Sequence, residues 1–158
     1  MSNLIHQLHN NTSINRYPKI FKFCSDSFDS KNNLNILSFG CSTGEEILTL
    51  GLYFGNSKIY GVEVNKELVE LCKKKFTLIE RVEINNIIPD ISFDIVFCMS
   101  VFCKWPESKN MNDISELYSF EMFENEICKI DEKIKKGGLL VLYNSNFLFE
   151  ETKIFNKY

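Results

Sequence analysis

A glycine-rich loop between two apolar segments is the part of this chain best suited to chemistry. The apolar run 35–39 ends at Gly40, and Gly44 opens the next apolar segment. Such a loop offers backbone N–H groups and a helix N-terminus to a ligand, with no side chain in the way. The next short apolar run ends on the carboxylate of Glu63. A glycine loop followed by an acid at the tip of the next strand is typical of a nucleoside site, with the carboxylate on the ribose hydroxyls.

Alternating strands and helices must position these groups. Apolar residues spaced three or four apart predict helices over residues 17–29, 44–54, 65–76 and from 120 to a C-cap at Gly137-Gly138. Apolar runs predict strands at 35–39, 58–63, 81–84, 93–98 and 139–143. Because the two kinds of element alternate, the strands should be parallel and joined by right-handed crossovers. We expect an α/β fold: a three-layer, Rossmann-like open sheet, mostly parallel, in strand order 3-2-1-4-5.

Composition narrows the classes of partner and compartment. The net charge of −3 gives no electrostatic footprint for nucleic acid. No apolar run approaches the length of a bilayer span, and the first twenty residues lack a secretion-type core. The six cysteines form no C-x-x-C pair, which favours buried thiols in a reducing cytoplasm over disulfides or zinc ligands. We therefore expect a cytoplasmic protein with no membrane or nucleic-acid partner, and with no metal, since His6 and His9 alone are too few ligands.

Four motifs follow one another in a recognisable order. They are the loop Phe39–Gly44, the acid in Gly61–Asn65, the strand Phe93–Ser100 and the basic and Gly-Gly turn of Lys135–Leu140. Over about residues 34–145 the chain thereby resembles the class I S-adenosylmethionine-dependent methyltransferases. A dinucleotide-dependent oxidoreductase fits less well, because its phosphate loop needs a G-x-G-x-x-G pattern.

The resemblance implies a domain division, a cofactor and a reaction. A helical segment at 1–33 would precede an S-adenosylmethionine-binding domain at 34–158. That domain would transfer a methyl group to a small-molecule acceptor. The segment between 84 and 93 is too short for the usual helix, and the chain stops soon after the fifth strand, before the family's C-terminal antiparallel strand pair. The alternative is therefore a non-catalytic cofactor-binding module that needs a partner or a further C-terminal segment.

Ten residues match the positions at which the family binds its cofactor: Phe39, Gly40, Cys41, Ser42, Gly44, Glu63, Val64, Asn86, Met99 and Ser100. Asn86 could equally be a turn residue, and Met99 a core residue. We assign no catalytic residue, because no acid–base pair stands out and a sulfonium methyl donor needs orientation above all.

Several side chains admit two interpretations. Glu63 is expected at an exposed strand tip. One of Glu45 and Glu46, in the first turn of a helix, could contact the cofactor's amino group. Phe102 and Trp105 could form a lid over the acceptor or anchor their loop. The strand at 139–143 would form a bare apolar edge, so we expect the residues after Asn146, a second copy of the chain or aggregation to cover it.

Overall fold

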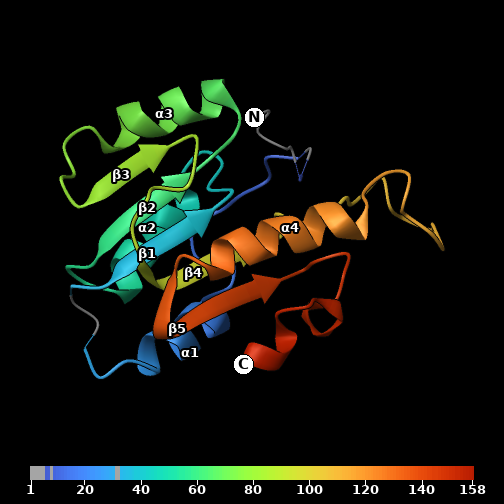
Figure 1. The fold of residues 1–158 in the computed structure, drawn as a ribbon. Helices are drawn as coiled ribbons and strands as arrows, with labels where there is room; N and C mark the ends of the chain where they lie inside the picture. Colours follow the sequence, from blue (N-terminus) through green and yellow to red (C-terminus); the bar gives the residue numbers. More distant parts are fainter. Residues whose placement is uncertain (1–5, 8, 31–32) are drawn as a thin grey trace.

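Five parallel strands form one sheet in the order β3-β2-β1-β4-β5. The computed structural model of the protein describes residues 6–7, 9–30 and 33–158, so residues 1–5, 8, 31 and 32 of the predicted N-terminal segment lie outside it. The strands are β1 (Asn35–Phe39), β2 (Lys58–Val62), β3 (Val82–Asn85), β4 (Phe93–Met99) and β5 (Ile134–Tyr143). The helices are α1 (Pro18–Asp26), α2 (Glu45–Tyr53), α3 (Lys66–Phe76) and α4 (Phe120–Asp131). The predicted fold class, strand order and sequence of elements are confirmed (Figure 1).

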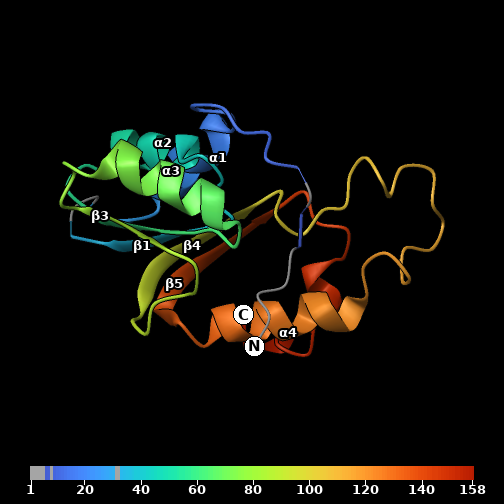
Figure 2. The same ribbon diagram turned by 90° about the horizontal axis from the view of Figure 1, so that it is seen from above.

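The helices cover both faces of the sheet. Helices α1, α2 and α3 lie on one face and α4 on the other, as seen from above in Figure 2. One core cluster contains Phe21 of α1, Leu50 of α2 and Cys72 of α3; the other contains Phe123 and Ile127 of α4. This division explains why the central strands are apolar on both faces.

Local signals set most of the helix starts. Pro18 occupies the first turn of α1, where its missing N–H costs nothing. Asn65 caps α3, since its side-chain oxygen accepts the backbone N–H groups of Glu67 at 2.9 Å and Leu68 at 3.4 Å. The cap fixes the chain directly after Glu63, at the edge of the candidate site.

The predicted end of the last helix is wrong. Helix α4 ends at Asp131, and Gly137-Gly138 lies inside β5 rather than at a C-cap. Ile134 pairs with Phe93 and Leu139 with Ile95, so the stretch between Ile134 and Leu139 bulges out of the ladder. Gly137, at φ +78°, supplies the conformation that the bulge needs. The apolar Ile134 therefore belongs to strand β5 and not to helix α4.

The C-terminal residues pack on α4 instead of adding a strand. After β5 the described chain forms two 3₁₀ turns, Phe149–Glu151 and Phe155–Lys157. Ile154 is buried in the cluster beneath α4, and the Lys157 ammonium bonds Asp131 at 2.7 Å. No backbone hydrogen bond joins residues 147–158 to β5. The tail thus covers part of one face of β5 but leaves its outer edge without a strand.

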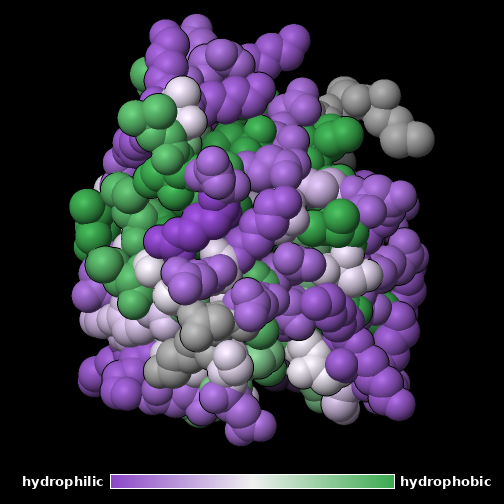
Figure 3. All heavy atoms as spheres, turned by 90° about the vertical axis from the view of Figure 1, so that its left-hand side faces the viewer, coloured by the Kyte–Doolittle hydropathy of each residue, from purple (hydrophilic) through white to green (hydrophobic). Residues whose placement is uncertain are grey.

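The end of the molecule that carries the amino ends of the strands is mostly hydrophilic (Figure 3). Apolar side chains interrupt the hydrophilic surface of this face (Figure 3). Leu52 of α2 and Leu78, just after α3, are among the exposed apolar residues of the protein. None of the helices in the described residues has the length and apolar character needed to span a bilayer. The candidate site lies at the opposite end of the sheet.

Candidate functional site

A cavity of about 320 Å³ opens at the carboxyl ends of β1, β2 and β4. Its walls come from the loop after β1, the ends of β2 and β4, and residues 6–7 and 9–17, which we call the N-terminal strap. The strap lines it with His6, Gln7, His9, Asn10, Asn11, Thr12, Ser13, Arg16 and Tyr17. A volume of this size falls within the range of small-molecule sites.

The loop after β1 is folded back against the end of β2. The N–H groups of Gly40 and Cys41 both donate to the Val62 carbonyl, at 2.8 and 3.0 Å. Gly40 adopts φ +78°, and a side chain there would come within 2.6 Å of the Val101 methyl group. Gly40 is therefore required for both the turn and the close approach of Val101.

Glu63 is buried, and this corrects the expectation of an exposed strand tip. Only 8% of the residue is exposed. One carboxylate oxygen accepts the N–H of Ser42 at 3.0 Å and the other accepts the N–H of Asn65 at 2.9 Å. The carboxylate thus links the glycine loop to the N-terminus of α3 while it lines the cavity. Each oxygen keeps a further lone pair for a ligand hydroxyl.

The two acids at the start of α2 have different environments. Glu45 accepts bonds from Thr43 at 2.5 Å and from the Lys75 ammonium at 2.8 Å, and these bonds lower its pKa although burial opposes the shift. Glu46 lines the cavity and accepts the Ser38 hydroxyl at 2.7 Å. Burial raises the pKa of Glu46 to about 7, even though the Ser38 bond and the charge of Arg16 act against it. Of the pair, Glu46 is the one in contact with the cavity.

A polar cluster forms where β4 and β5 end. The Ser100 hydroxyl lies 3.0 Å from the Tyr17 hydroxyl and accepts the Asn144 amide at 3.1 Å. The Gln7 amide donates to the Ser100 carbonyl at 3.3 Å. Ser100 adopts φ +61°, a conformation that is uncommon for residues other than glycine and is often found at functional sites.

The N-terminal strap is held across the cavity by its ends and its middle. His6 is buried between Phe39, Phe102 and Tyr118, and its Nδ1 lies 2.8 Å from the Tyr118 hydroxyl. Burial lowers the pKa of His6 to about 4, so the imidazole is neutral at pH 7. In the middle of the strap, the Asn10 carbonyl accepts the Ser42 hydroxyl at 3.1 Å.

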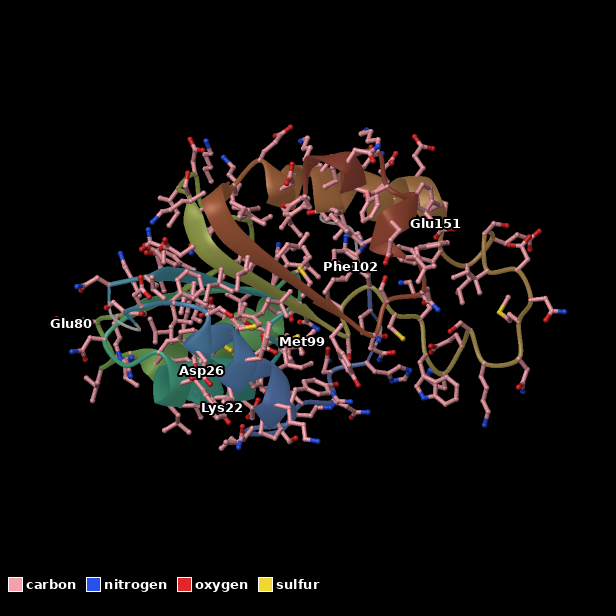
Figure 4. All side chains as sticks on the ribbon, turned by 90° about the horizontal axis from the view of Figure 1, so that it is seen from below. Lys22, Asp26, Glu80, Met99, Phe102 and Glu151 are labelled. Carbon is pink, nitrogen blue, oxygen red and sulfur yellow. The ribbon has the colours of Figure 1, made fainter. Side chains whose placement is uncertain are left out.

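The far side of the cavity mouth is formed by the loop after β4. His9 Nε2 lies 3.0 Å from a carboxylate oxygen of Glu107, so the strap and this loop meet. Trp105 lines the mouth with 52% of its surface exposed, whereas Phe102 is fully buried and stacks on Phe39. Phe102 anchors the loop; Trp105 remains at the rim. Figure 4 shows Met99 and Phe102 near the middle of the molecule and Glu80 at the opposite end of the sheet.

The structure brings most of the predicted site residues together. The cavity is lined by Phe39, Gly40, Cys41, Ser42, Glu63, Val64, Met99 and Ser100. Gly44 and Asn86 do not line it. Gly44, at φ +90°, lets Phe76 approach, because a side chain there would lie 2.6 Å from its ring. Asn86 is exposed on the loop after β3.

Sequence reasoning missed the strap and the cavity position of Arg16, Tyr17 and Asn144. Only Tyr17 falls within a helical pattern, and there the spacing indicates core packing. Among the described residues, no group of three or more His, Cys, Asp and Glu side chains could hold a metal ion.

A methyltransferase-domain family model matches residues 37–142, which is more than half of the chain. The chain belongs to the methyltransferase-domain family. The match includes the glycine loop, Glu63 and the end of β4, which line the cavity, whereas the N-terminal strap lies outside the matched residues. No curated protein sequence is significantly similar to the chain.

Solved methyltransferase structures share the fold at low sequence identity. Coclaurine N-methyltransferase bound to N-methylheliamine and SAH is 17% identical with a TM-score of 0.56, and the match covers 78% of this chain and 34% of that one. PKMT2 from Rickettsia typhi in complex with AdoHcy is 17% identical with a TM-score of 0.59, and the match covers 82% of this chain and 25% of that one. StiE O-MT residues 942–1257 are 22% identical with a TM-score of 0.51, and the match covers 78% of this chain and 41% of that one. The chain thus spans well under half the length of each.

Proposed function

We propose that this domain binds S-adenosylmethionine and transfers its methyl group to a small-molecule acceptor. The observation that carries the proposal is the Glu63 carboxylate, buried at the cavity wall with both oxygens oriented by backbone N–H groups. A carboxylate held in this way is suited to accept both hydroxyls of a ribose. The domain family and the SAH- and AdoHcy-bound structural neighbours support the same ligand.

The cavity also suits the amino-acid end of this ligand, which carries one ammonium and one carboxylate group. Glu46 lies on one wall, and Arg16, whose charge is felt by Glu46, lies on the strap. We assign Glu46 to the ammonium and Arg16 to the carboxylate. Because the pKa of Glu46 is about 7, the acid would ionise as the ammonium binds beside it.

When bound, S-adenosylmethionine supplies an activated methyl group on a sulfonium. The residues of the chain then have to orient the acceptor and exclude water. The hydroxyls of Tyr17 and Ser100 and the amide of Asn144 form a polar surface beside Met99, and we assign them to acceptor orientation. The strap and Trp105 cover the cavity mouth and would shield the reaction from solvent.

The size of the cavity, about 320 Å³, favours a small acceptor over a macromolecule. Two chain segments meet at the mouth of the cavity through His9 and Glu107, and the net charge of −3 gives no general electrostatic attraction for nucleic acid. All six cysteines are free, which supports a reducing compartment such as the cytoplasm.

The pH dependence of SAH affinity tests the assignment of Glu46. SAH carries the same ammonium and carboxylate as the methyl donor. Below pH 7 Glu46 is protonated in the free protein. The affinity for SAH should therefore decrease as the pH is lowered below 7, at most about tenfold per pH unit. The variant Glu46→Gln should bind more weakly at pH 8 and show a flat profile between pH 7.5 and 5.5. An unchanged slope in the variant would remove Glu46 from the site.

Turnover distinguishes an enzyme from a binding module. The purified chain would be incubated with methyl-labelled S-adenosylmethionine and, in separate reactions, with the small-molecule and the macromolecular fraction of one cell extract, with Glu63→Gln as the control. Label in a low-molecular-weight product that depends on Glu63 supports the proposal. SAH binding without any labelled product from a range of extracts would favour the non-catalytic module, and label on protein or nucleic acid alone would exclude a small acceptor.

A further inference from the structure

The single tryptophan of the chain, Trp105, lies at the rim of the cavity with 52% of its surface exposed. Tryptophan carries a large apolar surface and normally buries most of it. Phe102, Cys103 and Lys104, which lie directly before it, are all buried. The exposure of Trp105 is therefore a property of this one position and not of a loosely packed loop.

Hydrogen bonds hold the backbone on both sides of Trp105. The Lys104 N–H donates to the side-chain oxygen of Asn146 at 2.6 Å, and the Ser108 N–H donates to the Lys104 carbonyl at 2.9 Å. The Lys109 ammonium lies 5.3 Å from the centre of the Trp105 ring, which is a cation–π contact. The indole is thus fixed at the mouth of the cavity while about half of its surface remains exposed.

The strand order places Trp105 on the side of the cavity away from Glu63. Glu63 follows β2, Trp105 lies in the loop after β4, and β1 separates these two strands in the sheet. In Figure 2 this loop extends outward from the carboxyl end of β4. Met99 and Ser100 lie where the same strand ends. Because the ribose of the methyl donor is assigned to Glu63, Trp105 belongs to the side that is left for the acceptor.

The charged side chains of the cavity wall are already assigned to the methyl donor. Apart from histidines, three charged residues among those described line the cavity: Arg16, Glu46 and Glu63. Burial lowers the pKa of His6 to about 4, so its imidazole is neutral at pH 7, and His9 contacts the Glu107 carboxylate. The wall that remains for the acceptor is apolar or uncharged and polar, which favours an acceptor without charge.

A pair of hydroxyls on this side can donate one proton to a ligand. The Tyr17 and Ser100 hydroxyls lie 3.0 Å apart and share one hydrogen bond, and Ser100 also accepts the Asn144 amide. Two hydroxyls carry two protons, and the bond between them uses one. In the described part of the chain the second proton has no acceptor, so the pair can donate it to an oxygen atom of the acceptor.

We propose that the acceptor is an uncharged aromatic compound whose flat ring stacks on Trp105 and whose hydroxyl group bonds to the Tyr17–Ser100 pair. All three side chains line the same cavity. An aromatic pair is more stable than its buried area alone predicts, so the indole would select flat rings over saturated ones. That the bound compound accepts a methyl group rests on the function proposed above; the binding of an aromatic ring at Trp105 does not.

The test compares aromatic compounds with hydrogenated compounds that carry the same hydroxyl groups. The probes are catechol with cyclohexane-1,2-diol, and 2-naphthol with decahydro-2-naphthol, each titrated by calorimetry into the full chain in the presence of excess SAH. We expect at least one aromatic probe to bind saturably, and at least about threefold more tightly than its hydrogenated partner. Catechol should also change the fluorescence of the protein, which has only one tryptophan.

Two substitutions at one position separate the aromatic ring from mere bulk. Trp105→Phe keeps a flat ring and should retain the preference for the aromatic probe, whereas Trp105→Leu should lose it. Because Trp105 is half exposed, neither substitution opens a cavity in the core. Met111→Leu is the matched control, since Met111 is an exposed apolar residue of the same loop that does not line the cavity.

Each outcome decides the proposal. Equal affinity for the aromatic and hydrogenated probes overturns it, as does the absence of binding by all of them or a preference that persists in Trp105→Leu. A fluorescence change with SAH alone, and none with the aromatic probes, would assign Trp105 to the adenine of the methyl donor and also overturn it. If the protein does not bind SAH at all, the proposed function fails, and the same titrations without SAH still report separately on the aromatic site.

Discussion

Glu63→Gln should lower both the stability of the protein and its affinity for SAH. The carboxylate accepts two backbone N–H groups, from Ser42 at 3.0 Å and from Asn65 at 2.9 Å. Glutamine keeps one acceptor oxygen and places an NH₂ group against the other donor. Hydrogen bonds to charged groups contribute about 1.5–3 kcal/mol each, so the free energy of unfolding should fall by about that amount.

The same substitution should lower the affinity for SAH by roughly 10- to 150-fold, because one ribose hydroxyl loses its charged hydrogen-bond partner. Urea unfolding at pH 7.5 measures the first effect, and calorimetric titration of the folded variant measures the second. Glu80→Gln is the matched control, because Glu80 is an exposed acid at the opposite end of the sheet and should change neither value (Figure 4). If Glu63→Gln matched the control in both measurements, Glu63 would hold neither the loop nor the ligand.

Two further predictions concern the strap and the sheet edge. Burial lowers the pKa of His6 to about 4 in the folded protein, whereas the pKa of a histidine in the unfolded chain is about 6.5. As the pH falls from 6.5 to 4, His6 is therefore protonated in the unfolded chain but not in the folded protein. The free energy of unfolding should decrease over this range by up to about 3 kcal/mol. His6→Phe should flatten that part of the profile in urea unfolding at several pH values, and an equally steep profile would show that another group titrates. We also propose that a second copy of the chain covers the outer edge of β5. Light scattering should then show a dimer with Leu139–Tyr143 protected from amide exchange, and a monomer whose edge amides exchange freely would refute this.

The sequence contained strong signals for the first half of the domain. Apolar runs and glycine turns predict β1, α2, β2 and α3 within a few residues, because each boundary has a local cause, such as the Asn65 cap. The end of α4 had no such cause. Ile134 continues the helical spacing, yet its pairing with Phe93 in β5 decides its conformation, and this pairing is set by tertiary structure.

The site shows the same division between local and long-range causes. The loop residues and Glu63 could be assigned from their order along the chain, but the burial of Glu63 depends on backbone groups from two separate segments. The strap is polar and lacks periodicity, so no pattern predicted that Asn10 would contact the glycine loop. A single hydrogen bond between segments far apart in the sequence cannot be predicted from the spacing of apolar residues.

The most direct test of the central claim is a calorimetric titration of the reduced chain with SAH and, in parallel, with NAD. Both ligands contain an adenosine ribose, but only SAH carries the amino-acid end that Glu46 and Arg16 would hold. The account predicts saturable binding of one SAH per chain and no comparable heat with NAD. Saturable binding of NAD with no heat from SAH would contradict it.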